Sequence, residues 1–491
     1  MDLLELQNGS DIRGVAIASP DNAATLDVIA AEKIGAAFAT WLKEAKGIIK
    51  AVISVGRDPR LSGKELSAAF IKGLYKGGAH SVYDFDICTT PAMFVSTQPN
   101  LLDCDAAAIA TASHLPRDRN GFKLFTKEGG LSDIDIKAVL YTAQRDISYK
   151  PSNKTAQKAN FLDTYAKTLV EGIQHATLSL KPFEGLKIMV DAGNGSGGFF
   201  AEKVLSPLGA DTSSSQFLEP DGEFPNHMPN PDNQNVMDAF CQAVKRANVD
   251  LGIIFDTDVD RAAIVESDGS PIAKSKLIAL VSEVVLLENP GSIIVTDSVT
   301  STSLTSFIRA RGGHHHRYRR GYSNVINEAK RLDRMSGNCA LAIETSGHCA
   351  FKENNFLDDG AYLAVKALIF YSMLRKQGLY ISDALSGYQD PLEELEKRVR
   401  LIETANRNIG AQIVNDFELF ASSIEGWEID EPNYEGNRAK TDYGWILVRQ
   451  SLHEPELVVN IESDEAGGAL KLYEKFQEFI RMYENSTKLD F

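Results

Sequence analysis

The fold class follows from one segment, residues 51–86, which reads AVISVGRDPRLSGKELSAAFIKGLYKGGAHSVYDFD. Its β-branched start predicts a strand that stops at Gly56, and residues 61–78 have the spacing of an amphipathic helix ending at paired glycines. A second strand-like run, residues 81–86, follows directly. Strand, helix and strand in this order predict a right-handed crossover and a mostly parallel sheet.

The same alternation continues on both sides of this segment. Upstream, residues 28–42 place apolar side chains at helical spacing, with Ile34 and Phe38 on one side. Downstream, AAAIATASH at residues 106–114 predicts a strand of small residues. The polar stretch KPSNKTAQK that follows is typical of a linker, so we predict a first α/β unit over residues 1–152.

Two further α/β units and a different C-terminal unit are predicted. The second unit, residues 153–270, alternates the helix FLDTYAKTLVEGI, the strand LKIMVDA, the helix FFAEKVLSPLG and the strand LGIIFD. The third, residues 271–385, starts with a helix before the strand SIIVTD. Residues 386–491 contain the strand-like runs GWILVRQ and ELVVNIE and a final amphipathic helix, which predicts a small α+β domain.

Composition and charge exclude several classes of protein. The 491 residues include 67 acidic and 51 basic side chains, and this net charge of −16 repels nucleic acid and anionic membranes. The five cysteines form no C-x-x-C pair, which argues against a disulfide framework or structural zinc and fits a reducing compartment. No signal peptide or membrane-spanning run is expected. We therefore expect a cytoplasmic protein, or a plastid protein if a transit peptide was removed, without nucleic-acid or membrane partners.

The segment GIIFDTDVDRAAIV, residues 252–265, predicts a metal site. If the strand extends through it, Asp256, Asp258 and Asp260 project to the same side. Two carboxylates about 4 Å apart repel by about 4 kcal/mol at an effective dielectric of about 20, so a cation is needed. Oxygen ligands without His or Cys favour Mg²⁺. An EF-hand fails because Arg261 and Ser267 stand where it needs Gly and Glu, and a solvated acidic turn is the remaining alternative.

A reactive serine is the interpretation of AAAIATASHLPRDRNGFKLF, residues 106–125. The strand leads to Ser113 and His114 on a loop stiffened by Pro116. Basic charge surrounds this serine, contributed by Arg117, Arg119 and Lys123. Such charge suits a phosphorylated serine, which becomes a phosphoryl donor when a metal neutralises its oxygens. Taken in isolation, an ordinary turn is the alternative.

Two further polar segments suit a phosphorylated sugar. AIETSGHCAF places Glu344, Ser346 and His348 around a glycine, a density of donors and acceptors that suits sugar hydroxyls, although a polar loop explains it too. GWILVRQSLHEPEL places Arg449, followed by Ser451 and His453, after a strand. Arginine is well shaped for bidentate phosphate binding.

Two other patterns are rejected as sites. The spacing of Gly193, Gly195 and Gly198 matches a dinucleotide fingerprint between strand and helix, with Asp211 where a ribose-binding acid is sought. A dinucleotide interpretation explains none of the other four segments. The histidines 314–316 are adjacent and do not converge easily on one ion, so we interpret them as part of a basic loop with Arg317, Arg319 and Arg320.

Taken together and in this order, the motifs resemble those of the α-D-phosphohexomutase superfamily. TASHLPRDRNGFK resembles its phosphoserine loop, DTDVDR its metal loop, ETSGH its sugar-specificity loop and RQSLHEP its phosphate-binding loop. The resemblance implies four domains around a central cleft. Three would be related α/β domains, 1–152 with the phosphoserine loop, 153–270 with the metal loop and 271–385 with the sugar-specificity loop, and 386–491 would be an α+β domain with the phosphate-binding loop.

The resemblance also implies a role for each site residue. Ser113 would be phosphorylated and would hold a single Mg²⁺ together with Asp256, Asp258 and Asp260. His114 and Lys123 would transfer protons, and Arg261 would stabilise charge. The substrate would be bound by a larger set, namely Asp11, Arg13, Arg320, Glu344, Ser346, His348, Arg449, Ser451 and His453.

The implied reaction interconverts hexose 1-phosphate and hexose 6-phosphate, of glucose or mannose, through the phosphoserine and a 1,6-bisphosphate intermediate, with glucose 1,6-bisphosphate as activator. ETSGH is closest to the pattern of phosphoglucomutase/phosphomannomutase enzymes. Phosphoglucosamine mutase, a phosphosugar-binding homologue with little turnover, and a metal-dependent phosphohydrolase are alternatives. Leu115, His453 and Val299 replace the usual Asn, Thr and Lys, which leaves the sugar open. A monomer or weak homodimer is expected.

Overall fold

The computed structural model describes residues 2–20, 22–99, 101–145, 147, 149, 151–402, 408–451, 455–484 and 486–489. The chain divides into two compact units. The first comprises Met1–Val284 and Ser346–Ala384, and the second comprises Val285–Thr345 and Leu385–Phe491.

The first unit begins with a mixed sheet in the order β1-β2-β6-β5-β3-β4-β8. Its strands are β1 (Gln7–Asn8), β2 (Asp11–Val15), β3 (Val52–Arg57), β4 (Ser81–Ile87), β5 (Ala106–Ala110), β6 (Arg119–Thr126) and β8 (Gln157–Lys158), with β7 (Gly129–Gly130) beside β6. β3 is parallel to β4 and β5, as expected, but β6 is antiparallel to β5 and β2. The prediction of a mostly parallel sheet is therefore wrong at this edge, because the short loop after β5 can only return the chain antiparallel.

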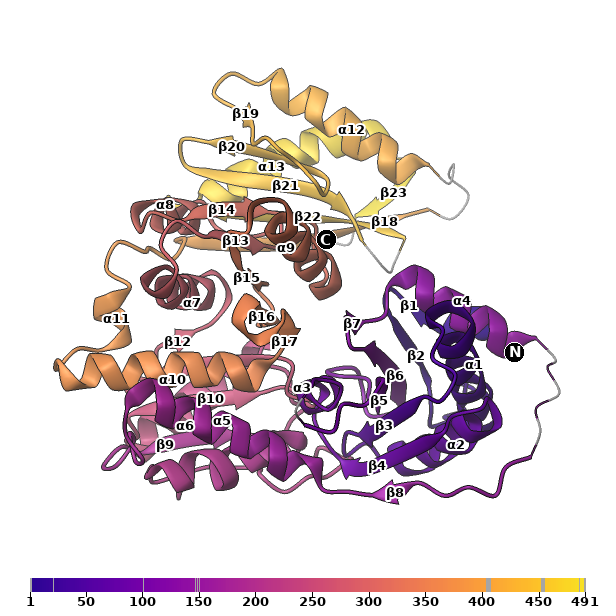
Figure 1. Cartoon of the computed structure of the whole chain (residues 1–491). Coiled ribbons are helices and arrows are strands. Elements are labelled where there is room, and N and C mark those ends of the chain that lie inside the picture. The colour runs from indigo at the N-terminus through magenta and orange to yellow at the C-terminus, as the bar shows by residue number, and fades with distance from the viewer. Residues whose placement is uncertain are drawn as a thin grey trace. The chain divides into compact units, whose positions relative to one another are not determined.

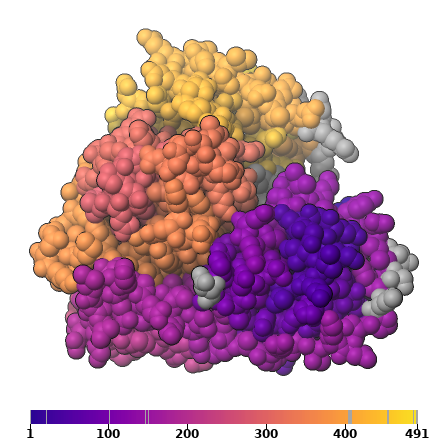
Figure 2. All heavy atoms as spheres, viewed as in Figure 1, coloured from indigo at the N-terminus to yellow at the C-terminus, as the bar shows by residue number. Residues whose placement is uncertain are grey.

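Helices cover both faces of this sheet. They are α1 (Val28–Lys46), α2 (Gly63–Lys76), α3 (Thr90–Val95) and α4 (Asp133–Gln144). Figure 1 shows α1, α2 and α4 on one face and α3 on the other. The rings of Phe70 and Phe122 stack at 4.6 Å between α2 and β6. A side chain at Gly73 would lie 2.0 Å from the Glu32 carbonyl, so glycine lets α2 cross close to α1. In Figure 2 the N-terminal residues, drawn in indigo, lie together on the face shown.

A second sheet of the first unit carries the acidic segment. Its order is β12-β11-β10-β9, with β9 (Ile188–Asp191), β10 (Leu251–Phe255), β11 (Ala262–Glu266) and β12 (Pro271–Ile272). β10 is parallel to β9 and antiparallel to β11. Further elements of this unit are α5 (Phe161–Thr177), α6 (Gln234–Ala247), the hairpin β16 (Cys349–Phe351) and β17 (Leu357–Asp358), α10 (Gly360–Lys376) and α11 (Ile381–Ala384).

The second unit holds a parallel layer and an antiparallel sheet. In the parallel layer, β13 (Ile293–Thr296) lies between β14 (His314–Arg317) and β15 (Cys339–Ile343). The helices beside it are α8 (Thr302–Ala310) and α9 (Tyr322–Ser336), and the chain enters this unit within α7 (Lys274–Glu288).

The antiparallel sheet follows the order β19-β20-β21-β22-β18-β23. Its elements are β18 (Glu393–Leu401), α12 (Ile409–Ser422), β19 (Glu428–Ile429), β20 (Asn437–Thr441), β21 (Gly444–Gln450), β22 (Glu456–Ser463), α13 (Gly468–Ile480) and β23 (Thr487–Leu489). Figure 1 shows α12 and α13 on one face of this sheet, and the buried rings of Phe417 and Phe479 meet there at 5.4 Å. No helix within the described ranges is long and apolar enough to cross a membrane.

Candidate active site

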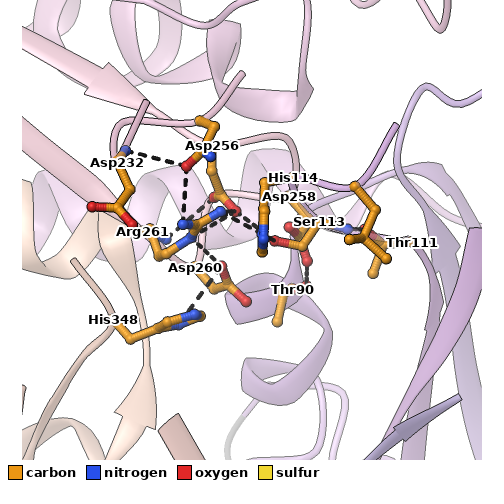
Figure 3. A network of polar contacts seen from close by, with 12 residues as sticks. Thr90, Thr111, Ser113, His114, Asp232, Asp256, Asp258, Asp260, Arg261 and His348 are labelled. Carbon is orange, nitrogen blue, oxygen red and sulfur yellow. Dashed lines mark hydrogen bonds and ion pairs between the residues drawn. The ribbon is translucent and has the colours of Figure 1, made fainter. Parts of the chain in front are cut away.

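Ser113 lies on the loop between β5 and β6 in an uncommon backbone conformation. Its φ is +49° and the residue is 5% exposed. A non-glycine residue in this region carries strain that surrounding contacts must hold. Its amide donates to Thr111 Oγ1 at 2.9 Å, and its Oγ donates to Asp256 Oδ2 at 2.9 Å (Figure 3). The serine predicted to react therefore lies against the acidic segment.

The carboxylates of Asp256, Asp258 and Asp260 lie close together, but they lie on a loop and not on the predicted extended strand. The strand does not extend through them, since β10 ends at Phe255, which pairs with Ala262 at the start of β11. Because β11 returns antiparallel to β10, the intervening residues form a reversing loop. Val259 has φ +67° in that loop. The three carboxylates are fully buried and their ligand atoms lie within 4.8 Å of one another.

The glycine-rich turn after β9 supports this loop. The Ser196 amide donates to the Thr257 carbonyl at 2.8 Å. A side chain at Gly195 would lie 2.8 Å from the same carbonyl. Packing against the loop of residues 256–261 thus accounts for glycine at this position of the rejected dinucleotide fingerprint.

Cations and hydroxyls surround the carboxylates. Lys123 Nζ lies 3.2 Å from Asp258 Oδ2 and also contacts Asp260. Arg261 Nη2 lies 3.2 Å from Asp256 Oδ2 and 3.5 Å from Ser113 Oγ. Thr90 donates its hydroxyl to Asp258. All three groups come from different elements, and sequence analysis missed Thr90 because a threonine at a helix start has no distinctive signal.

The acidic cluster fits a divalent cation. Two fully buried oxygens, Asp258 Oδ1 and Asp260 Oδ1, accept no hydrogen bond from the described residues. Such atoms are costly to bury unless they coordinate something. The cluster of three aspartates offers oxygen donors alone, which Mg²⁺ prefers.

The pKa values of neighbouring carboxyls are driven apart. Burial and the charge of Asp260 raise the pKa of Asp256 well above its usual range. Burial also tends to raise the pKa of Asp260, but the charges of Lys123, His348 and Arg261 outweigh burial and lower the pKa of that carboxyl. Opposed shifts within one cluster are typical of functional sites.

The pKa values of His114 and His348 are shifted in opposite directions. His114 Nδ1 lies 3.3 Å from Ser113 Oγ. His114 is exposed, yet desolvation of its ring and the positive charge of Arg261 lower its pKa. Burial opposes the charging of His348, but Asp358 at 2.7 Å and Asp260 raise its pKa to about 9. Asp358 was not predicted from the sequence, since an acid at the end of a short strand has no distinctive spacing.

Three other predicted residues of the first unit have defined positions. Arg13 on β2 donates to Asp11 Oδ2 at 2.8 Å and to the Thr111 carbonyl, so this pair adjoins the serine loop. Ser346 is half-buried beside Gly347, where φ is +93°. A side chain at Gly347 would lie 2.9 Å from the Ala262 carbonyl, so the turn packs against β11.

Arg320, Glu344 and Arg449 lie in the second unit. Glu344 accepts the Gly321 amide at 2.6 Å. The carboxylate of Glu435 joins the two arginines, because it accepts the Arg320 amide at 3.0 Å and lies 3.6 Å from Arg449 Nη1. Glu435 was not predicted from the sequence, because its partners Arg320 and Arg449 are not its neighbours in the chain. The Ser451 amide donates to the Glu456 carbonyl at 2.9 Å, whereas His453 lies outside the described residues.

The histidine triplet is not the predicted basic loop. Residues 314–317 form β14, paired in parallel with β13, because alternate side chains find partners on both sides. His315 hydrogen-bonds Thr296 Oγ1 at 2.8 Å, and His316 hydrogen-bonds Glu328 at 3.0 Å. These separate partners agree with the conclusion that the histidines do not share an ion.

Comparison with known proteins identifies the class. Three family models match, described as phosphoglucomutase/phosphomannomutase alpha/beta/alpha domains I, II and III, over residues 5–149, 163–269 and 274–390. Their succession, followed by the antiparallel C-terminal sheet, confirms the predicted α/β fold class. The chain therefore belongs to the phosphoglucomutase/phosphomannomutase family. The prediction of an intramolecular phosphotransferase is confirmed at the level of this family.

Individual relatives span most of the chain. A phosphomannomutase/phosphoglucomutase of Pseudomonas syringae is 32% identical over 84% of this chain and 83% of its own length. A phosphoglucomutase of Neisseria gonorrhoeae is 30% identical over 96% of this chain and 95% of its own length. A crystal structure of a phosphoglucomutase/phosphomannomutase family protein from Burkholderia thailandensis has a TM-score of 0.83 at 26% identity and full coverage of both chains.

Proposed function

We propose that this chain interconverts hexose 1-phosphate and hexose 6-phosphate, of glucose or mannose, through a phosphoserine at Ser113 and a 1,6-bisphosphate. The carrying observation is the position of Ser113 Oγ, 2.9 Å from Asp256 Oδ2 and 3.5 Å from Arg261 Nη2. The names of the Pseudomonas and Neisseria relatives support glucose and mannose as the sugars.

Ser113, Asp256, Asp258 and Asp260 are the residues proposed to hold Mg²⁺. When bound, the ion would supply positive charge to the oxygens of the transferring phosphoryl group. Support comes from the two buried oxygens, Asp258 Oδ1 and Asp260 Oδ1, that accept no hydrogen bond among the described residues.

The chain's own residues would carry the transfer in two steps. A free hydroxyl of the hexose monophosphate attacks phosphorus, the bond from phosphorus to Ser113 Oγ breaks, and Arg261 stabilises the charge. The hydroxyl proton would pass to the imidazole of His114, and the ammonium group of Lys123 would supply the proton that Ser113 Oγ takes up. The bisphosphate then turns end for end, and its other phosphate returns to Ser113 with these proton movements reversed.

The remaining predicted residues are proposed to hold the substrate. Arg320, Arg449, Ser451 and His453 would hold the phosphate that is not reacting. Sugar hydroxyls would be bound by Asp11, Arg13, Glu344, Ser346 and His348. The boundaries we propose for the four domains are 1–152, 153–270, 271–385 and 386–491.

A substrate panel tests the proposal. Purified protein with Mg²⁺ and catalytic hexose 1,6-bisphosphate is given glucose 1-phosphate, mannose 1-phosphate or glucosamine 1-phosphate, and products are separated by ³¹P NMR. We expect 6-phosphates of glucose or mannose. Turnover of glucosamine 1-phosphate alone would identify a phosphoglucosamine mutase, and net release of inorganic phosphate a hydrolase. No isomer from any of the three would contradict the proposed function. Intact mass of the protein after bisphosphate treatment, against Ser113→Ala, tests the phosphoserine directly.

A further inference from the structure

We propose that Arg60 is the positioning residue of the serine loop, and that its guanidinium sets the place of Ser113 through backbone carbonyls, independently of the side chain at position 115. This inference rests on the proposed function, because it assigns Arg60 to the positioning of the transferring serine.

The guanidinium of Arg60 contacts the loop at four carbonyls. Nη2 donates to Ser113 at 2.6 Å and to Leu115, and Nη1 donates to Pro116 at 2.6 Å and to Arg119 at 3.0 Å. Arg60 is 1% exposed. A guanidinium presents its donors in a rigid planar fork, so four carbonyl acceptors bound to it fix the path of the loop. A lysine would supply one point of charge in place of this fork.

Asp58 orients Arg60 and is also linked to the Ser113 amide through the hydroxyl of Thr111. Asp58 Oδ2 lies 3.2 Å from Arg60 Nε and accepts the Thr111 hydroxyl at 2.7 Å. Thr111 Oγ1 in turn accepts the Ser113 amide at 2.9 Å. The Ser113 carbonyl is therefore held directly by Arg60, and the Ser113 amide is held by Thr111, whose hydroxyl is bound by Asp58. Such contacts can maintain the φ of +49° at Ser113.

Arg60 itself is fixed by the neighbouring segment. Its backbone bridges to Gly222, and a side chain at Gly222 would lie 2.4 Å from the Pro59 carbonyl. The ring of Phe224 lies 5.5 Å from the guanidinium carbon, within the range of a cation–π contact. The charge therefore has little freedom to follow a displaced loop.

Leu115 shows why this matters in this chain. Its amide donates to the Ala112 carbonyl at 3.1 Å and its own carbonyl accepts from Arg60. Only its apolar side chain is left outside these contacts. Leucine in place of a polar residue thus removes no hydrogen bond that the observed loop uses, which argues against reading this position as a sign of lost turnover.

The test combines two variants of Arg60 with two controls. Arg60→Lys keeps the charge, Arg60→Met removes it, and Leu115→Asn restores a polar side chain. Lys366→Met is the matched control, because Lys366 is also buried in the first unit. Its Nζ lies 2.9 Å from Glu353 Oε1, and neither residue belongs to the segment 111–119. Amide hydrogen exchange of residues 111–119 and steady-state kinetics are measured on the full chain.

We expect both Arg60 variants to increase exchange in residues 111–119 and to lower kcat about a hundredfold with little change in KM, as for a misplaced reacting group. Leu115→Asn should leave exchange and kcat as in the wild type. Lys366→Met should lower the melting temperature without raising exchange in the loop. If Arg60→Met does not fold, loop exchange and kcat of Arg60→Lys alone test the proposal.

Wild-type loop exchange or kcat in Arg60→Lys would overturn the proposal, and so would an equal rise of loop exchange in Lys366→Met. A large effect of Leu115→Asn on either readout would contradict independence from position 115. Absence of mutase activity in the wild type would contradict the proposed function instead, and the exchange measurement would still decide whether Arg60 positions the loop.

Discussion

Ser113 Oγ and Asp256 Oδ2 lie 2.9 Å apart although 143 positions separate them in the chain. The same Asp256 oxygen accepts from Arg261 Nη2 at 3.2 Å, and that nitrogen lies 3.5 Å from the serine hydroxyl. One hydroxyl therefore joins the loop after β5 to the loop after β10. A carboxylate and a guanidinium at the same oxygen suit a site where negative charge arrives with the phosphoryl group.

Replacing Asp258 by asparagine should remove most of the stabilisation of the folded protein by Mg²⁺. A ligand that binds only the folded state stabilises by about 2.7 kcal/mol at about 100 times its Kd, so the wild-type melting temperature should rise with MgCl2. Asp258→Asn removes one buried charge of the cluster and should remove most of that rise. The control is Asp268→Asn, an exposed acid whose carboxylate accepts from the Ser270 amide at 2.8 Å. An equal Mg²⁺-dependent shift in Asp258→Asn and wild type would contradict the metal assignment.

A methyl group at Gly195 should displace the loop of residues 256–261, which we propose holds Mg²⁺. The added carbon would lie 2.8 Å from the Thr257 carbonyl, between two of the aspartates. Overpacking of this kind costs about 1–3 kcal/mol, and the shifted loop should bind Mg²⁺ more weakly. Gly172→Ala is the control, because that glycine is exposed in α5 with open space around it, and alanine there should stabilise by about 0.5–1 kcal/mol. Unfolding and Mg²⁺ titration of both variants check this, and unchanged Mg²⁺ affinity in Gly195→Ala would count against support of the loop by the turn.

The fold was accessible from sequence because its signals are local. The helix expected in residues 61–78 is α2 (Gly63–Lys76), and the strand expected at 81–86 is β4 (Ser81–Ile87). Apolar periodicity and terminal glycines record such elements directly. Strand direction at an edge is different, since it depends on which strand pairs with which. That is why the antiparallel β6 and the reversal after Phe255 were not foreseen.

The site was accessible only where its residues cluster in the sequence. Ser113 and the three aspartates stood out through neighbouring charge and spacing. Arg60 did not, because its acceptors are backbone carbonyls between 53 and 59 positions away, and any residue type supplies a carbonyl. Asp358 and Glu435 were missed for a related reason. The role of a single acid depends on the partner that the fold places beside it, and that partner cannot be identified from the sequence around the acid.

His227 should contribute stability that depends on pH. Burial opposes its charging, but hydrogen bonding to Asp191 at 3.0 Å raises the pKa of His227 in the folded protein. The contribution is therefore fully present below the unfolded pKa of about 6.5 and is lost as the pH rises through the folded pKa. His227→Gln should cost about 1.5–3 kcal/mol near pH 6, with a smaller cost at alkaline pH. Urea unfolding across pH checks this against His80→Gln, an exposed histidine, and a cost independent of pH would contradict it.

Arg449→Lys should weaken substrate binding more than turnover. Arg449 is 4% exposed on β21, and its neighbour Glu435 lies 3.6 Å from Nη1, so the guanidinium is held in one place for an anion. A lysine cannot offer two parallel donors to phosphate, and loss of about 1.4 kcal/mol of a charge-assisted hydrogen bond raises KM about tenfold. Because this phosphate does not react, kcat should change little. Arg398→Lys is the control, since Arg398 is a more exposed arginine of the same sheet that pairs with Glu396 at 3.0 Å. A fall in kcat with unchanged KM would instead place Arg449 at the transferring phosphate.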